Sequence, residues 1–248
     1  MNSMKKIFIK EKLKNIGFEL ENISLGDFDI IGEYTAKKAR DPTSELFKSA
    51  GCFFRPNYER GILLYSLVST FNIESYLEIG FGRGYSSLCV AKAMCDLGID
   101  GKITTIDPAL DEDFISNLTK FYPKEWFDKI KFIKGTSSSV MSSVKEEFDL
   151  IYIDGDHRYD AVKSDWEMTK NLYKKFIIFD DYHLPGVEQK DIDVASVVDD
   201  IDDETKELII TDRRIFFDDR QIADDDINYG QVILTNKSFD TSQYIVNW

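Results

Sequence analysis

The stretch from Tyr76 to Ser86 reads YLEIGFGRGYS and joins a short apolar run to a turn with three glycines. Downstream of it, short apolar runs alternate with longer amphipathic stretches, which is the pattern of βαβ units in a parallel sheet. Glycines between a strand and a helix let the backbone approach a ligand closely, and the first amides of the helix favour an anionic group. The stretch therefore predicts an open α/β sheet that binds a ligand at the carboxyl ends of its strands.

The expected elements follow from the spacing of apolar residues. Parallel strands are expected at 76–79, 102–106, 130–133, 150–153 and 176–179, and a terminal antiparallel pair at 207–210 and 231–234. Helices are expected at 58–71, 86–97, 113–121 and 159–174. Together they predict a Rossmann-like, mostly parallel sheet of seven strands with helices on both faces and an antiparallel last strand.

No repeat, linker or low-complexity tract divides the chain, so we expect a single domain. Residues 51–248 would form its body, and residues 1–50 would add an N-terminal helical cap of one or two helices. An amphipathic helix in this cap can pack on its own sheet or on a second copy of the chain, which leaves a homo-oligomer open.

The 248 residues include 31 basic and 45 acidic side chains, which gives a net charge of −14. An acidic surface repels phosphate backbones, so a nucleic-acid partner is not expected. No apolar run reaches the roughly 20 residues of a membrane helix, and no signal-peptide pattern opens the chain. We therefore expect a cytoplasmic protein without a membrane partner.

Two other features are interpreted as structural. The acid-rich segment 188–226 predicts solvated surface, because Tyr229 and Thr235 stand where an EF-hand loop would need glycine and glutamate. The three cysteines show no CxxC spacing and predict buried or inert thiols.

The glycine spacing also bears on the ligand. A dinucleotide fingerprint, GxGxxG, would need glycine at position 85, where the chain has Tyr85. Asp107 closes the next strand and could accept hydrogen bonds from two ribose hydroxyls, or could cap the following helix. Thr136 and Ser137 follow the third strand, where an adenine edge would lie, although a plain polar loop explains them equally well.

Three aspartates follow two further strands: Asp154 in LIYIDGDH, and Asp180 and Asp181 in FIIFDDYH. Neighbouring strands would aim these acids at one point, and adjacent acids repel each other without a cation, so we expect a divalent metal. Capping or turn formation is the simpler alternative. His157 is a candidate proton acceptor or a histidine that only caps or packs, and His183 could line the pocket.

With these motifs in order, the chain resembles the class I S-adenosylmethionine-dependent methyltransferases over about residues 50–235. Within that class it is most similar to the metal-dependent small-molecule O-methyltransferases of the macrocin and catechol types. The resemblance implies S-adenosylmethionine and Mg²⁺, or another divalent cation, as cofactors, and a small-molecule hydroxyl as the methyl acceptor. Catechol-type enzymes carry lysine where this chain has His157 and Asp-Asn where it has Asp180-Asp181, which favours a sugar or glycosylated metabolite.

The resemblance also assigns roles by position. It implies His157 and Asp154 as catalytic residues, and Asp154, Asp180 and Asp181 as metal ligands. The implied cofactor contacts are Glu78, Gly80, Phe81, Gly82, Gly84, Ser86, Asp107, Thr136, Ser137 and Asp154.

Three other functions remain open at this point. A methyltransferase of the same fold could work without metal, with Asp154 binding a substrate amine. A nicotinamide-dependent oxidoreductase or a non-catalytic nucleoside-binding protein could use a similar sheet.

Overall fold

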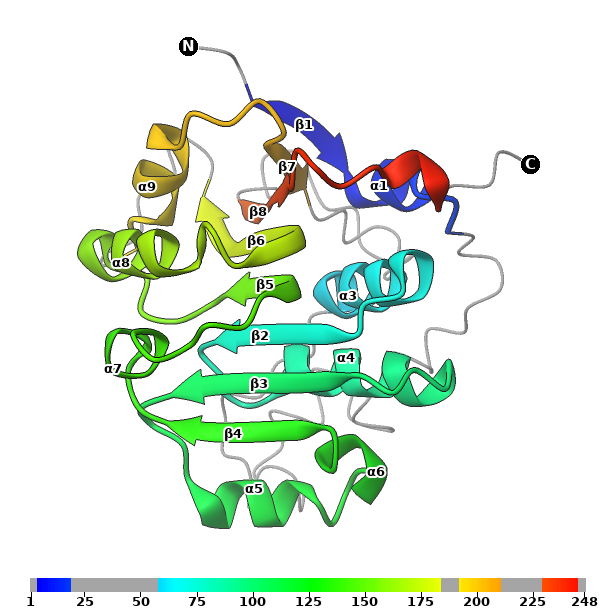
Figure 1. The fold of residues 1–248 in the computed structure, drawn as a ribbon, viewed down its shortest axis with the longest axis vertical. Helices are drawn as coiled ribbons and strands as arrows, with labels where there is room; N and C mark the ends of the chain where they lie inside the picture. The colour runs from blue at the N-terminus through cyan, green and yellow to red at the C-terminus, as the bar shows by residue number, and fades with distance from the viewer. Residues whose placement is uncertain (1–3, 19–57, 184–191, 211–228, 245–248) are drawn as a thin grey trace, which may run out of the picture.

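The computed structural model describes residues 4–18, 58–183, 192–210 and 229–244. Within these ranges, a single eight-stranded sheet runs through the molecule, with helices on both of its faces (Figure 1). The strands are β1 Lys5–Phe8, β2 Ser75–Ile79, β3 Lys102–Asp107, β4 Ile130–Lys134, β5 Phe148–Ile153, β6 Tyr173–His183, β7 Glu207–Ile210 and β8 Tyr229–Thr235. The helices are α1 Ile9–Asn15, α3 Tyr58–Phe71, α4 Tyr85–Asp96, α5 Glu112–Leu118, α6 Lys124–Phe127, α7 Ser137–Met141, α8 Tyr159–Thr169, α9 Val194–Asp200 and the 3₁₀ helix η5 Thr241–Gln243.

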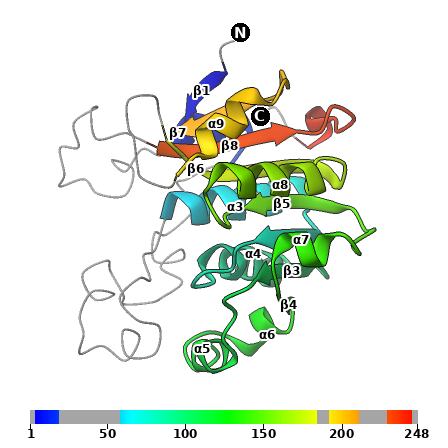
Figure 2. The same ribbon diagram turned by 90° about the vertical axis from the view of Figure 1, so that its left-hand side faces the viewer.

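The strand order is β1-β7-β8-β6-β5-β2-β3-β4. β8 pairs antiparallel with both β6 and β7, and every other pairing in this sheet is parallel. From β2 the chain proceeds outward through β3 and β4, then returns to the other side of β2 with β5. This reversal creates a switch point at the carboxyl ends of β2 and β5, where open α/β sheets bind ligands. Figure 2 looks onto that side of the sheet.

Two apolar clusters cover the two faces of the sheet. One gathers side chains of α1, α3, α4, α5 and α6, and the other gathers side chains of α7, α8 and α9. Successive strand residues alternate between them: Tyr76 belongs to the first cluster and Leu77 to the second. Because both faces are covered, β5 and β6 contain continuous apolar runs, at 150–153 and 176–179, rather than alternating ones.

The sheet has eight strands, so the expected count of seven is wrong. The additional strand is β1, which lies in the segment expected to be only helical and pairs in parallel with β7, Lys5 opposite Glu207. β1 has four residues, of which Ile7 alone is buried, too short a stretch for period-2 alternation to reveal. α1 supplies a helix, and the rest of the expected cap, residues 19–50, lies outside the described residues. So do residues 188–191 and 211–226 of the acid-rich segment.

The boundary between α8 and β6 also differs from the expectation. α8 ends at Thr169 instead of residue 174, and Tyr173 opens β6 opposite Phe148 of β5. β6 then continues to His183, so Asp180 and Asp181 lie within the strand and not beyond its end. The terminal antiparallel pair, β7 with β8, is confirmed.

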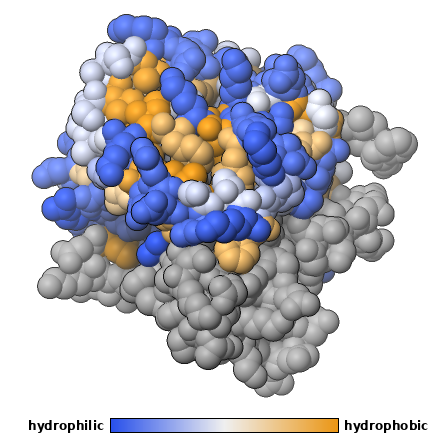
Figure 3. Space-filling model, turned by 90° about the horizontal axis from the view of Figure 1, so that it is seen from below, coloured by the Kyte–Doolittle hydropathy of each residue, from blue (hydrophilic) through white to orange (hydrophobic). Residues whose placement is uncertain are grey.

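The surface of the described residues is mixed in polarity. Seen from the side of the β4 edge, hydrophilic side chains surround smaller apolar areas (Figure 3). Among the described residues, every helix is too short or too polar to cross a bilayer.

Two ion pairs of Glu207 connect β1 and α1 to β7. Glu207 accepts from Nζ of Lys5 at 2.7 Å and also pairs with Nζ of Lys12. Burial opposes ionisation of Glu207, but Lys12 and Lys5 hold its pKa below the usual value. Glu207→Gln should therefore lower the free energy of unfolding by about 1 kcal/mol and speed amide hydrogen exchange in β1.

Urea unfolding and hydrogen exchange measure both effects. The control is Glu204→Gln, whose carboxylate is exposed and 3.8 Å from Lys237, and which should change stability by less than about 0.5 kcal/mol. Equal effects of the two variants would show that these ion pairs do not anchor β1.

Candidate functional site

Two glycines of the turn lie so close to neighbouring groups that no side chain would fit at either position without displacing them. After β2 ends at Ile79, the backbone passes through Gly80 with φ of 93°, a left-handed conformation that favours glycine. A Cβ at Gly80 would overlap with the carbonyl oxygen of Asp154, at the end of neighbouring β5. Gly84, with φ of 86°, precedes α4, and a Cβ there would overlap with the ring of Phe81. The glycines thus allow β2, β5 and α4 to meet at one point.

Asp107 ties this turn to the end of β3. Its Oδ2 accepts from the backbone N–H of Gly82 at 2.9 Å, and its Oδ1 accepts from the N–H of Ala109 at 2.7 Å. The following helix, α5, is capped by Asp111, so capping does not explain Asp107. An ionised carboxylate offers about four lone-pair sites, which leaves Asp107 further capacity to accept hydrogen bonds from a ligand.

Glu78 is buried beneath the turn. Oγ of Ser87 and Oγ1 of Thr105, the latter at 3.2 Å, donate to its carboxyl group. Burial raises the pKa of Glu78 to about 8, which favours its protonated form at neutral pH. Glu78 therefore connects β2 to β3 and α4 as an uncharged group, in a structural position rather than a ligand-facing one.

A cleft of ≈ 480 Å³ opens at the carboxyl ends of β2, β3 and β5. This volume lies in the usual range for small-molecule sites. The cleft is lined by Ile79, Gly80, Gly82, Ile106, Asp107, Pro108, Thr136, Ser137, Ser138, Asp154, Gly155, Asp156, Ala161, Ser164 and Asp165.

α7 and α8 form the wall of the cleft opposite the glycine turn. Oγ of Ser137 donates to Oδ1 of Asp165, a carboxyl group that is 3% exposed. Burial raises the pKa of Asp165 to about 6. Thr136 caps α7 by accepting from the N–H of Ser139 at 3.3 Å. This wall therefore presents hydroxyl and carboxyl groups that can pair with the polar edge of a heterocycle.

The second acidic segment lies at a β-bulge. Between Phe179 and Tyr182 the register of β6 against β8 shifts, and Asp180 and Asp181 together oppose the single Gln231. Asp181 has φ of 51°, in the left-handed region. The two adjacent carboxylates accordingly have different partners.

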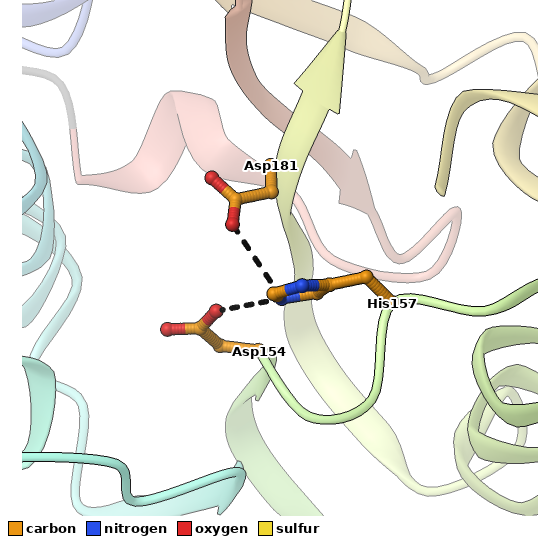
Figure 4. A group of neighbouring side chains, drawn as sticks. All are labelled: Asp154, His157 and Asp181. Carbon is orange, nitrogen blue, oxygen red and sulfur yellow. Dashed lines mark hydrogen bonds and ion pairs between the residues drawn. The ribbon is translucent and has the colours of Figure 1, made fainter. Parts of the chain in front are cut away.

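Asp154, His157 and Asp181 lie together at the carboxyl ends of β5 and β6 (Figure 4). Nε2 of His157 is 3.5 Å from Oδ1 of Asp154 and 3.5 Å from Oδ2 of Asp181. One ligand atom from each residue lies within 4.8 Å of the others, a spacing that could hold a metal ion. The hydrogen bond with Asp154 raises the pKa of His157, burial lowers it, and the charge of Asp181 raises it further.

Asp180 points to a different set of partners. Its carboxylate forms an ion pair with Nη2 of Arg60, and its Oδ1 accepts from Nε2 of Gln231 at 3.0 Å. Nη1 of Arg60 also lies 3.0 Å from Oδ2 of Asp154. Arg60, near the start of α3, thus links the ends of β5 and β6.

The structure brings six of the ten expected cofactor contacts to the cleft and leaves four beneath it. Those that line the cleft are Gly80, Gly82, Asp107, Thr136, Ser137 and Asp154. Those buried below the turn are Glu78, Phe81, Gly84 and Ser86. Of the expected metal ligands, Asp154 and Asp181 lie together beside His157, whereas Asp180 is paired with Arg60.

Two residues of the site were not expected. Asp165 stands three positions after Val162 and four before Thr169, on the buried face of α8, so its helical spacing was the available signal. Arg60 belongs to no motif, and no pattern in the sequence pointed to it.

Residues 77–182 match the family model described as a methyltransferase domain. This segment contains the glycine turn, Asp107, the cleft wall and the acidic residues. No curated protein sequence matches the chain.

Several solved structures share the fold at low sequence identity. Cofactor-bound Rv0187 from MTB is 15% identical with a TM-score of 0.57, over 84% of this chain and 93% of that one. The O-methyltransferase from Bacillus cereus in complex with SAH is 15% identical with a TM-score of 0.55, over 92% and 97%. TomG from Streptomyces achromogenes, an O-methyltransferase of tomaymycin synthesis in complex with SAM, is 15% identical with a TM-score of 0.51, over 84% and 92%. At this identity the similarity establishes the Rossmann-like methyltransferase fold.

The contact between Gly80 and Asp154 predicts a large difference between two glycine substitutions. Gly80→Ala should lower the free energy of unfolding by at least ~3 kcal/mol, because strain at positive φ adds to an overlap with backbone. Gly82→Ala should cost only about 1–2 kcal/mol, because its φ of 52° is strained but the space around its Cβ is open. Denaturant unfolding of the two variants measures the difference, and equal losses would contradict the close approach.

Proposed function

We propose that this protein is an S-adenosylmethionine-dependent O-methyltransferase that methylates a hydroxyl group of a small molecule. The reaction would use a divalent cation, for which Mg²⁺ is the first candidate. The observation that carries the proposal is the position of Asp154, which lines the cleft and also faces His157. A ligand in the cleft would therefore lie beside a group that can accept a proton.

The cleft suits an adenosine-containing cofactor. Asp107 would accept hydrogen bonds from the ribose hydroxyls, and the turn around Gly80 and Gly82 would receive the amino-acid end through its backbone. Ser137 and Asp165 would pair with the polar edge of the base, since both present side-chain oxygens on the opposite wall.

The acidic cluster suits a hard divalent cation. Asp154 and Asp181 offer carboxylate oxygens, the donors that Mg²⁺ prefers, and they lie close enough to share one ion. Because Mg²⁺ usually keeps several exchangeable waters, two protein carboxylates would leave room for a substrate oxygen.

The proposed reaction is a direct methyl transfer. When bound, S-adenosylmethionine supplies an electrophilic methyl group, and a divalent cation lowers the pKa of a coordinated hydroxyl. His157 would accept the hydroxyl proton as the oxygen bonds to the methyl carbon and the carbon–sulfur bond breaks, which leaves S-adenosylhomocysteine. The cleft would hold the reacting atoms in near-attack geometry.

The acceptor is proposed to be a sugar or a glycosylated metabolite, on the grounds of His157 and the Asp180-Asp181 pair. A screen with methyl-labelled S-adenosylmethionine should begin with sugars and polyols and extend to catechols.

One observation favours a second candidate, a methyltransferase that needs no metal. Arg60 already places a positive charge between Asp154 and Asp180, and this charge offsets part of their repulsion. Activity that survives exhaustive chelation would select this candidate.

The cofactor assignment predicts the effect of Asp107→Asn. Loss of a charged acceptor should weaken S-adenosylmethionine binding at least about tenfold, because hydrogen bonds to charged groups contribute about 1.5–3 kcal/mol. Isothermal titration of wild type and variant measures this, with NADH as a ligand that should give no response.

The control for this titration is Asp111→Asn, which changes the cap of α5 outside the cleft and should leave the affinity within about twofold. A response of the wild type to NADH, or silence with S-adenosylmethionine, would contradict the proposed cofactor.

The assignment of His157 as the proton acceptor predicts a selective loss of turnover. His157→Gln should lower kcat about 10²–10⁴-fold, while S-adenosylmethionine affinity stays within about twofold because His157 does not line the cleft. Added imidazole should restore part of the rate. A variant that keeps wild-type kcat with an acceptor found in the screen would exclude His157 as the base.

A further inference from the structure

Arg60 is the cation that the described structure places inside the acidic site. Its guanidinium reaches two carboxylates at once, Oδ2 of Asp154 at 3.0 Å and Oδ2 of Asp180. Its side chain is 17% exposed, and Asp180 is fully buried. A buried ion pair of this kind persists only where geometry and further hydrogen bonds compensate for the loss of water.

The surroundings of Asp180 provide that compensation. Its Oδ1 accepts from Nε2 of Gln231 at 3.0 Å, while its Oδ2 pairs with Arg60. Both oxygens of this carboxylate therefore have partners within the protein. The bulge in β6 separates Asp180 from Asp181, which instead faces Nε2 of His157 at 3.5 Å.

The formal charges of the three aspartates and Arg60 agree with this pairing. Asp154, Asp180 and Asp181 contribute three negative charges and Arg60 one positive charge. Two negative charges remain, which one divalent cation would neutralise. The carboxylate oxygens directed toward His157 are Oδ1 of Asp154 and Oδ2 of Asp181, and they lie away from the guanidinium contacts.

We propose that Arg60 is a built-in counter-cation that takes Asp180 out of the metal ligand set and leaves Asp154 and Asp181 to hold the divalent ion. Arg60 acts as a positioning residue: it holds one oxygen of Asp154, so that the other faces His157. The proposal rests on the proposed function only in assuming that a divalent cation binds this site.

The test is a Mn²⁺ titration of the full chain, followed by calorimetry or by electron paramagnetic resonance of the free ion. The matched pair is Asp180→Asn and Asp181→Asn, two adjacent residues that lose the same charge. Asp181→Asn should weaken Mn²⁺ binding at least about tenfold, because it removes a ligand. Asp180→Asn should change the affinity less than about threefold.

Two variants of Arg60 test its own role. Arg60→Met removes the positive charge beside Asp154 and should tighten Mn²⁺ binding at least about threefold. Arg60→Lys keeps the charge and should stay within about threefold of the wild type. Circular dichroism checks the fold of each variant, and if Arg60→Met does not fold, the aspartate pair and Arg60→Lys still decide the question.

Two different results would overturn the proposal for Arg60. Equal losses of Mn²⁺ affinity in the two aspartate variants would make Asp180 a ligand and overturn the proposal. Absence of Mn²⁺ binding in both the wild type and Arg60→Met would overturn it as well. In either case the methyltransferase proposal stands if the same wild-type sample binds S-adenosylmethionine, and it fails separately if that sample does not.

Discussion

The backbone of Gly80 lies directly against the carbonyl of Asp154, and the arrangement of the site depends on this contact. A side chain at position 80 would push the ends of β2 and β5 apart, because its Cβ would overlap with that carbonyl oxygen. With glycine there, the N–H of Gly80 donates to Ile106 at 2.9 Å and the N–H of Asp154 donates to Ile79 at 2.8 Å. The ends of three strands are thereby held together at the switch point of the sheet, and the cleft and the acidic cluster meet at Asp154.

Each carboxylate around the cleft is stabilised by its own hydrogen-bond donors or cation. Asp107 accepts two backbone N–H groups, Asp180 is paired with Arg60, and Asp154 and Asp181 flank His157. Each buried carboxylate thus has donors or a cation that offset its loss of water. Glu78 differs from these aspartates, because burial raises its pKa to about 8 and favours the neutral form of its carboxyl group.

The central strands and the cleft residues could be predicted because they depend on local pattern. A continuous apolar run followed by an aspartate marks a strand buried on both faces, and this holds for β5 and Asp154. The β-bulge could not be predicted, because it arises from the register between β6 and β8. The role of Arg60 could not be predicted for a related reason: it contacts Asp154 across 94 positions of sequence, and no local signal encodes such a contact. β1 could not be predicted because only one of its four residues is buried, which leaves no alternating pattern to detect.

The most direct test of the account is a crystal structure of the protein with S-adenosylhomocysteine. We expect the ligand to occupy the cleft, with its ribose hydroxyls on Asp107, its base between Ser137 and Asp165, and its sulfur directed toward Asp154. Density for the ligand elsewhere on the sheet, or a cleft that stays empty at saturating ligand, would contradict the account.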